Sequence, residues 1–276
     1  MIKCFCKKWN MYILLFLSLC MSYKASDTLH AKLKTGSLYA ALGTSFIGLN
    51  ELWYKSYKSA SFHVFNDSKE WYQMDKLGHL YSCFHITTMG LEMPAQHIGQ
   101  KTLNTVSGLL FLSGIEVLDA YSTGWGFSKS DMLANVLGCA SAIALHKSIV
   151  HQMLYFKFGY WPSPYADQNP KLLGQNGFTR ILKDYNGQSY WLSCSLKYKF
   201  WPKWLALSLG YGITGFIHAY PDTLHSKRLF KCSIDFNPNA IKSSKGWLKP
   251  IKWIFKYVKF PFPSLAFNEK KVFLTY

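Results

Sequence analysis

The chain has 276 residues, of which 49% are hydrophobic, 17% aromatic and 16% charged. This composition excludes intrinsic disorder, a collagen-like repeat and a small disulfide-stabilised fold. The net charge is +17, and residues 151–276 contribute +13 of it through 18 basic and five acidic side chains. Only Arg180 and Arg228 are arginines, whereas proteins that read phosphates or base edges rely on the planar guanidinium. The charge therefore disfavours nucleic-acid binding and leaves two explanations, an anionic membrane surface or a compositional drift toward lysine.

Residues 1–22 have the pattern of an export signal or N-terminal anchor. Three lysines precede an apolar run from Met11 to Met21, which matches the charged start and short hydrophobic core of such signals. Small residues at Cys20 and Ser22 predict cleavage after Ser22, and lipid attachment at Cys20 or an uncleaved anchor are the alternatives. The mature chain would keep four cysteines, as buried thiols or as two disulfides: Cys83, Cys139, Cys194 and Cys232.

Residues 23–160 are expected to form a helical domain. Four segments combine long apolar stretches with helical spacing: residues 36–53, 75–91, 101–121 and 131–154. Each approaches the length that spans a bilayer, about 20 residues, and their small residues allow close helix packing in lipid. Each also holds an ionisable residue, which a membrane bundle tolerates when the side chain faces its interior. We favour a membrane-associated bundle, with a soluble bundle as the alternative.

Three of these helices each contribute a polar pair at helical spacing. Together the pairs form the candidate site, which we call the predicted polar cluster: Asp75, His79, Glu116, Asp119, Asp131 and Asn135. Such groups could bind a divalent cation through oxygen ligands, or place a carboxylate and an imidazole for acid–base chemistry. The alternative is a structural network, in which Ser128 and Asp131 form a capping box that starts a helix. We favour the structural interpretation.

The same residues resemble family motifs. The motifs are Asp75-Lys76-x-Gly78-His79, Glu116-x-x-Asp119, Trp125-Gly126-Phe127-Ser128-x-x-Asp131-x-x-x-Asn135-x-x-Gly138 and the stretch from Lys183 to Ser193. Their order resembles the YfiM-like domain of unknown function, which is predicted to be exported to the bacterial envelope, over most of the mature chain. It is more distantly similar to VanZ-like membrane proteins, which usually have glutamine where Asp119 stands. The resemblance implies an envelope protein without an established reaction.

Residues 161–276 are expected to form a basic, β-rich region. Alternating apolar and polar residues predict strands over residues 190–200, 205–214, 230–237 and 272–276. Their aromatic-rich face resembles that of outer-membrane barrel strands, but four strands are too few to close a barrel, which needs about eight. We therefore expect a small antiparallel sheet that lies against the membrane or the helical half.

A basic amphipathic helix is predicted between the last two of these strands. Its membrane-surface contacts would be a set of lysines with one tryptophan: Lys249, Lys252, Lys256, Lys259 and Trp253. Such a helix suits an anionic lipid interface. The alternative is a peripheral helix that packs on the sheet with its lysines in water.

The sequence therefore predicts an α+β protein of the bacterial cell envelope, with membrane lipids as its partners and a structural or accessory role. It shows no nucleophile elbow, catalytic-cysteine signature or glycine-rich dinucleotide loop, and no cofactor is predicted beyond the divalent cation considered above. The alternative is an enzyme or ligand-binding protein that acts on a lipid-linked or cell-wall precursor at the predicted polar cluster. A third hypothesis makes the β-rich region part of an oligomeric pore. The sequence does not determine the oligomeric state.

Overall fold

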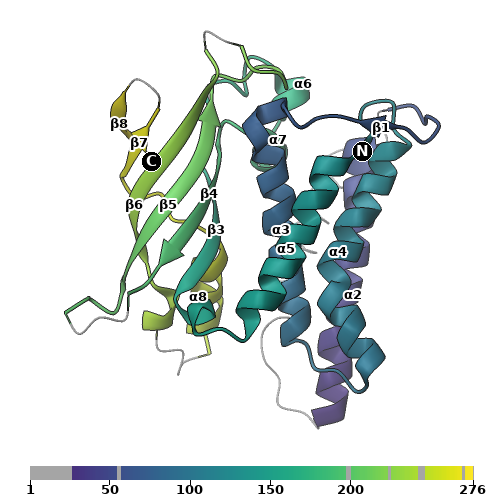
Figure 1. The fold of residues 1–276 in the computed structure, drawn as a ribbon, viewed down its shortest axis with the longest axis vertical. Coiled ribbons are helices and arrows are strands. Elements are labelled where there is room, and N and C mark those ends of the chain that lie inside the picture. The colour runs from purple at the N-terminus through teal and green to yellow at the C-terminus, as the bar shows by residue number, and fades with distance from the viewer. Residues whose placement is uncertain are drawn as a thin grey trace. The chain divides into compact units, whose positions relative to one another are not determined.

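The computed structural model describes residues 27–54, 57–196, 200–222, 225–241, 246–268 and 271–275. The predicted export signal, residues 1–22, lies outside these ranges. The fold is α+β, as predicted, with a helical N-terminal region followed by a six-stranded antiparallel sheet (Figure 1). The chain forms two compact units. The helical unit comprises the residues up to Phe65 with Ser82–Ile143, and the sheet unit comprises Asn66–Tyr81 with Ala144–Tyr276.

Four long helices form most of the helical unit, although the start of the second and the end of the fourth belong to the sheet unit. They are α2 (Asp27–Leu49), α3 (Met74–Glu92), α4 (Ile98–Ala120) and α5 (Lys129–His146). A π-helical turn, η1 (Asn50–Tyr54), continues α2, and the short strands β1 (Val64–Phe65) and β2 (Phe127–Ser128) pair in parallel. Helices α2 and α4 run side by side (Figure 1). The prediction of four helices is thus confirmed, although α5 ends eight residues earlier than expected.

Glycines let α3 and α4 approach closely. A Cβ atom added to Gly108 would lie 2.6 Å from the carbonyl oxygen of Cys83, and one added to Gly90 would lie 1.8 Å from that of Asn104. Cys83 packs with Leu112 and Cys139 in a small apolar cluster, and both cysteines are free thiols. Small residues therefore set the spacing of the bundle, as they do where helices pack without large side chains between them.

The sheet of the sheet unit has strands in sequence order, each antiparallel to the next. They are β3 (Leu154–Tyr160), β4 (Gln188–Cys194), β5 (Leu205–Thr214), β6 (Lys227–Phe236), β7 (Ser264–Phe267) and β8 (Val272–Thr275). Two short 3-10 turns of the sheet unit come before β3: η2 (Glu70–Gln73) and η3 (Ile149–Gln152). Helices and a turn link the later strands: α6 (Pro170–Leu173), α7 (Gly177–Lys183), η4 (Pro238–Ala240) and α8 (Leu248–Tyr257). Strand β5 has its predicted bounds. The expectation that residues up to 154 stay helical was wrong, because a strand begins there, and β7 was not predicted.

The register gives the sheet two different faces. Phe156, Leu192 and Leu209 lie opposite one another on neighbouring strands and line an apolar face. Lys157, Trp191 and Gly210 alternate with them and line a polar, small-residue face. Because side chains alternate along a strand, every strand of the sheet contributes to both faces.

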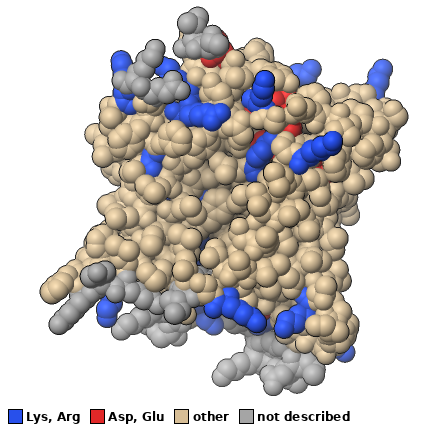
Figure 2. Space-filling view, viewed as in Figure 1, with Lys and Arg blue, Asp and Glu red and all other residues tan. Residues whose placement is uncertain are grey.

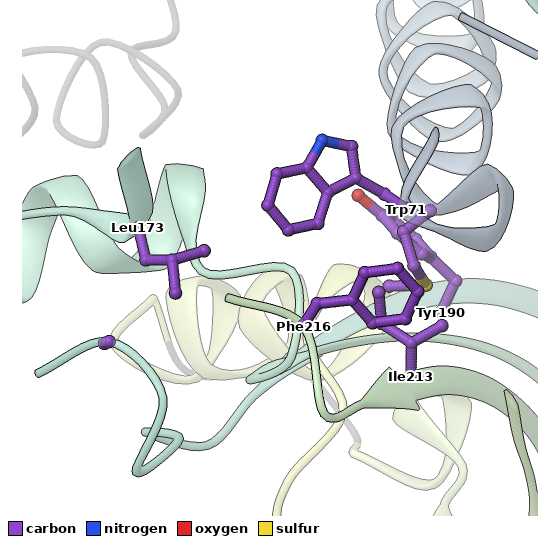
Figure 3. Close-up of a cluster of buried hydrophobic side chains, with 7 residues drawn as sticks. Trp71, Leu173, Tyr190, Ile213 and Phe216 are labelled. Atoms are coloured by element: carbon purple, nitrogen blue, oxygen red, sulfur yellow. The ribbon is translucent and has the colours of Figure 1, made fainter. Parts of the chain in front are cut away.

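Part of the apolar face is covered by the main core of the sheet unit (Figure 3). Trp71 and Phe216 lie against each other above Tyr190 and Ile213, with ring centroids of Trp71 and Phe216 5.8 Å apart. Met74, at the start of α3, is fully buried in the same cluster. This core fixes the first turns of α3 within the sheet unit.

Candidate functional site

A left-handed turn precedes the first polar pair. Three consecutive residues, Trp71, Tyr72 and Gln73, have φ angles of 48°, 44° and 65°. Non-glycine residues in this region are each strained by roughly 1–3 kcal/mol. The strain falls in η2, directly before α3, which begins at Met74. The turn therefore sets the direction from which α3 presents Asp75 and His79.

Contacts within the sheet unit hold the turn in place. The Tyr211 hydroxyl donates a hydrogen bond to the carbonyl oxygen of Tyr72 at 2.6 Å. Arg228 donates to Oε1 of Gln73 at 2.9 Å, and its guanidinium lies 4.4 Å from the ring centroid of Tyr72. The Trp71 amide donates to the carbonyl oxygen of Ala219. These contacts offset the strain, because each fixes one of the three left-handed residues.

The first polar pair is anchored by the sheet unit. The Tyr185 hydroxyl donates to Oδ1 of Asp75 at 2.7 Å, and the Lys76 ammonium lies 3.2 Å from Oδ2 of the same carboxylate. Lys76 also forms an ion pair with Asp67 at 2.6 Å. His79, one turn further along α3, interacts electrostatically with Asp75. The structure thus brings Asp75 and His79 together, as their spacing predicts.

Gly78 has a steric role in the same motif. A Cβ atom at this position would lie 3.0 Å from the hydroxyl oxygen of Tyr190. The missing side chain therefore lets α3 sit close to β4. Asp75, Lys76 and Gly78 thus each contact a residue of the sheet unit. The helical spacing of the motif alone does not predict these contacts.

The second and third polar pairs lie in the helical unit, where Glu116 caps α5. The fully buried Glu116 carboxylate accepts a hydrogen bond from the Ser128 amide at 3.1 Å, and the Ser128 hydroxyl accepts one from the Asp131 amide at 3.1 Å. In a standard capping box the third residue of the helix would return the bond to the cap amide. Here Glu116, from α4, accepts a hydrogen bond from the cap amide of Ser128.

Asn135 and Asp119 have different surroundings. Asn135 is fully buried on the same face of α5 as Asp131. Asp119 is half-buried, and its Oδ1 accepts a hydrogen bond from the Tyr54 hydroxyl at 2.7 Å. The structure thus links Glu116 to the start of α5 and Asp119 to η1. Convergence of all six residues of the predicted polar cluster stays a prediction, because Asp75 and His79 belong to the sheet unit and the other four to the helical unit.

A stripe of buried polar groups in the helical unit was not predicted. Asn104 and Ser107 lie on the face of α4 that also carries Gly108 and Glu116. The Asn104 side chain accepts a hydrogen bond from the Tyr39 hydroxyl of α2. Small and polar residues repeat here at spacings of three and four, a signal that could have identified this stripe.

The structure separates the predicted membrane-surface lysines into residues that reach solvent and one that is buried. Lys249 is exposed and Lys252 is half-buried on α8, and the Lys256 ammonium lies 5.4 Å from the Tyr257 ring centroid. Lys259 follows the helix and is buried. Its ammonium donates to the Ile234 carbonyl oxygen at 2.9 Å. Lys259 was therefore wrongly assigned to the exposed stripe, because the helix ends at Tyr257 and the strand-like chain beyond it turns this side chain inward.

Lys259 joins a buried charged network on the polar face of the sheet. The Lys157 ammonium and the Asp235 carboxylate form an ion pair at 2.8 Å, and both side chains are 0% exposed. The Lys259 ammonium lies 3.9 Å from Oδ1 of Asp235. Burial lowers the pKa of Lys259 from 10.5 to about 8, although the Asp235 charge opposes this change. Such a network closes the polar face without exposing a charge to water.

Several groups have the chemistry to bind a cation. Asp75 and His79 offer oxygen and nitrogen ligands in the sheet unit, and Glu116 and Asp131 offer oxygen ligands in the helical unit. Asp75 and Glu116 both accept hydrogen bonds from donors of the protein itself, so protein groups already bind oxygens of both carboxylates. Cation binding stays a prediction.

The fold and these contacts define an α+β protein that combines a helical unit with a polar interior and an antiparallel sheet. Residues 62–147 match the model of a family described as "Predicted periplasmic lipoprotein (DUF2279)". The match covers β1 through α5 and supports an uncharacterised exported bacterial domain, with localisation in the cell envelope. No curated protein matches the chain. No solved structure matches it either.

Proposed function

We propose that the protein is a membrane-associated component of the bacterial envelope, with its helical unit in contact with lipid and a structural or accessory role. The observation that carries this proposal is an inverted polarity. Asn104, Glu116 and Asn135 are at most 1% exposed, whereas Ile98 is 78% and Leu133 60% exposed. Soluble bundles bury apolar side chains and expose polar ones. In a bilayer, polar groups face the bundle interior.

Helix α4 is the strongest candidate for a membrane span. Among the described residues, it is the helix that is long and apolar enough to cross a membrane. Its 23 residues extend about 34 Å, and the hydrocarbon core of a bilayer is about 30 Å thick. Leu103, Leu110 and Val117 recur every seventh residue and are exposed. The stripe that they form suits lipid contact.

The polar interior supports a structural role within this proposal. The Glu116 carboxylate accepts a hydrogen bond from the Ser128 amide at the start of α5, and the Asn104 side chain accepts one from the Tyr39 hydroxyl of α2. Hydrogen bonds between helices in a membrane stabilise and orient a bundle, because lipid offers the polar groups no alternative partner. The described contacts of these side chains thus favour a scaffold.

Membrane extraction combined with a charge substitution tests the embedding. The variant Cys20→Ser is used throughout, so that lipid attachment at the signal cannot retain the protein. We expect the protein to stay in membranes during salt and alkaline washes and to be released by detergent. Leu110→Asp should release it or abolish its accumulation, because a central aspartate costs about 2.5–3.5 kcal/mol of insertion. Thr102→Asp, near the start of α4, is the matched control. Release of the parent protein by salt, without detergent, would refute the proposal.

A second candidate function is ligand binding at Asp75 and His79. The strained left-handed turn before them favours it, because backbone strain concentrates at functional sites. The ligand would be a divalent cation. Alternatively, it would be a lipid-linked or cell-wall precursor, bound through the cation or directly by the carboxylate of Asp75 and the imidazole of His79. Retention of Mg²⁺, Mn²⁺ and Zn²⁺ is compared in Asp75→Asn, His79→Ala and Glu116→Gln. If all three variants lose thermal stability and none changes metal retention, this candidate fails.

A further inference from the structure

Two buried cysteines of the helical unit lie close together. Cys83, in the middle of α3, and Cys139, in the middle of α5, pack with Leu112 in one apolar cluster, and both are at most 5% exposed. The Cys83 thiol interacts with both the thiol and the backbone of Cys139. A disulfide requires two Cα atoms within roughly 4.4–6.8 Å of each other. Interaction of one thiol with the backbone of the other cysteine is what such a separation produces.

Regular helix packing fixes the position of this pair. A Cβ atom added to Gly108 of α4 would lie 2.6 Å from the carbonyl oxygen of Cys83, so the two helices touch at their backbones. Leu112, one turn after Gly108, completes the cluster around the two thiols. On α5, Ala142 is buried three residues after Cys139. The approach of the two cysteines is therefore set by three helices rather than by loops.

The other two cysteines of the described chain are too far apart to pair. Cys194 and Cys232 lie on β4 and β6, which are separated by β5. Neighbouring strands are about 4.8 Å apart, so these two backbones are roughly 10 Å apart, beyond the reach of a disulfide. The register adds an offset along the strands, because Cys194 aligns with Leu207 and Cys232 with Leu209. Among the described residues, the geometry thus supports a disulfide within the helical unit and none within the sheet.

We propose that Cys83 and Cys139 form a disulfide when the exported chain folds in the cell envelope. The bacterial periplasm is kept oxidising by oxidoreductases that carry a reactive disulfide. The thiolate of one cysteine attacks this disulfide and forms a mixed disulfide, and the second cysteine then attacks the sulfur of the first. Two protons and two electrons pass from the pair to the oxidoreductase, which leaves as a dithiol. The inference rests on envelope localisation and not on the proposed embedding in lipid.

Burial of the pair determines when the bond forms. Exchange requires an accessible thiolate, so it takes place before α3, α4 and α5 close around the pair. Over the helices, Figure 2 shows charged side chains toward the helix ends and an uncharged surface between them. Once the helices have closed, a polar reductant does not reach the bond.

The bond would hold the polar interior of the helical unit together. It closes a loop of residues 84–138, which contains α4 and the start of α5. The Glu116 carboxylate and the Ser128 amide that donates to it both lie in this loop. A cross-link stabilises a fold mainly by restricting the unfolded chain. The disulfide therefore raises the stability of the helices that carry this hydrogen bond.

Counting of free thiols in the full chain tests the bond. One variant retains only Cys83 and Cys139, and the matched control retains only Cys194 and Cys232, with all other cysteines replaced by serine. Both variants are exported by cells grown with or without dithiothreitol. The proteins are precipitated with acid to stop exchange, denatured and treated with a maleimide of high mass, before and after reduction.

We expect the variant with Cys83 and Cys139 to stay unlabelled until it is reduced, and the control to carry two labels without reduction. After growth with dithiothreitol, both variants should carry two labels. Trypsin cleaves after the lysines that flank the pair, so non-reducing mass spectrometry should find residues 77–101 linked to residues 130–147.

Thermal unfolding gives a second measurement. The parent protein should melt at a lower temperature after growth with dithiothreitol, whereas Cys83→Ala should melt at the same temperature under both conditions. Two reactive thiols in the exported variant with Cys83 and Cys139, without reduction, overturn the proposal. A reducible dimer linked through these cysteines overturns it as well, because the bond would then join two copies. Either result leaves the alkaline-extraction test of the helical unit unaffected.

Discussion

Replacement of Asp235 by asparagine is expected to destabilise the sheet unit strongly. The carboxylate lies 2.8 Å from the Lys157 ammonium and 3.9 Å from that of Lys259, and it is fully buried. It also accepts hydrogen bonds from the hydroxyls of Ser193 and Ser208. Asparagine keeps the shape but removes the only acidic charge that this described network contains, so two buried ammonium groups lose their counter-ion.

The size of the effect follows from the burial of the pair. Removing one partner of a buried ion pair costs about 3–5 kcal/mol. Since 1.36 kcal/mol corresponds to a factor of ten, this is roughly two to four powers of ten in the unfolding equilibrium. A comparable substitution at an exposed pair, such as Asp167→Asn beside Arg180, should cost at most about 1 kcal/mol.

Hydrogen exchange followed by mass spectrometry measures the change locally. Peptides that cover β4 and β5 should lose protection in Asp235→Asn, and adding Lys157→Met should restore much of it, because a hydrophobic residue of similar volume removes the unpaired charge. The reasoning is refuted if Asp235→Asn changes protection no more than Asp167→Asn, or if the double variant is less stable than the single one.

Three further predictions follow from single positions. Burial lowers the pKa of Lys259 from 10.5 to about 8, so the folded state binds this proton less tightly than the unfolded chain. The free energy of unfolding should therefore rise between about pH 8 and about 10.5. Urea titrations should show that Lys259→Met reduces this rise with pH. Gly108→Val should lower thermal stability by about 1–3 kcal/mol through overpacking, because its Cβ would lie 2.6 Å from the Cys83 carbonyl oxygen, whereas Gly43→Val, with nothing within 4 Å, should not; equal melting temperatures would contradict this. Gln73→Gly should be more stable than Gln73→Ala by about 1–2 kcal/mol in chemical denaturation, because both lose the bond from Arg228 and only glycine relaxes the φ of 65°; equal stability would show that the turn is unstrained.

The strands show where sequence patterns succeed and fail. Strand β5 was predicted to the residue because its apolar residues alternate with small ones between clear turns. Strand β3 was missed because its alternation includes Lys157, whose burial depends on Asp235, 78 positions away in the sequence. In a sequence pattern lysine indicates an exposed position, so the pattern does not predict an ion pair with a residue of a distant strand.

The candidate site was predictable in its local spacing and not in its partners. The proximity of Asp75 and His79 follows from the helical repeat, and so does the shared face of Asp131 and Asn135. The bond from Tyr185 to Asp75 and the cap that Glu116 supplies to Ser128 depend on tertiary packing. The left-handed turn was missed for a similar reason, since nothing in Trp-Tyr-Gln marks a positive φ as glycine or asparagine would.

The way the chain contributes to the sheet unit has a consequence for the order of folding. Residues 66–81 emerge from synthesis and export before the strands that bury them. Their partners lie far along the chain: Tyr185 binds Asp75 across 110 positions, Arg228 binds Gln73 across 155 and the Tyr257 carbonyl binds Tyr81 across 176. Contacts of such separation form slowly, because loop closure comes first. Trp71 and Met74 thus stay uncovered until the chain has been made as far as Phe216, because Tyr190, Ile213 and Phe216 complete their cluster.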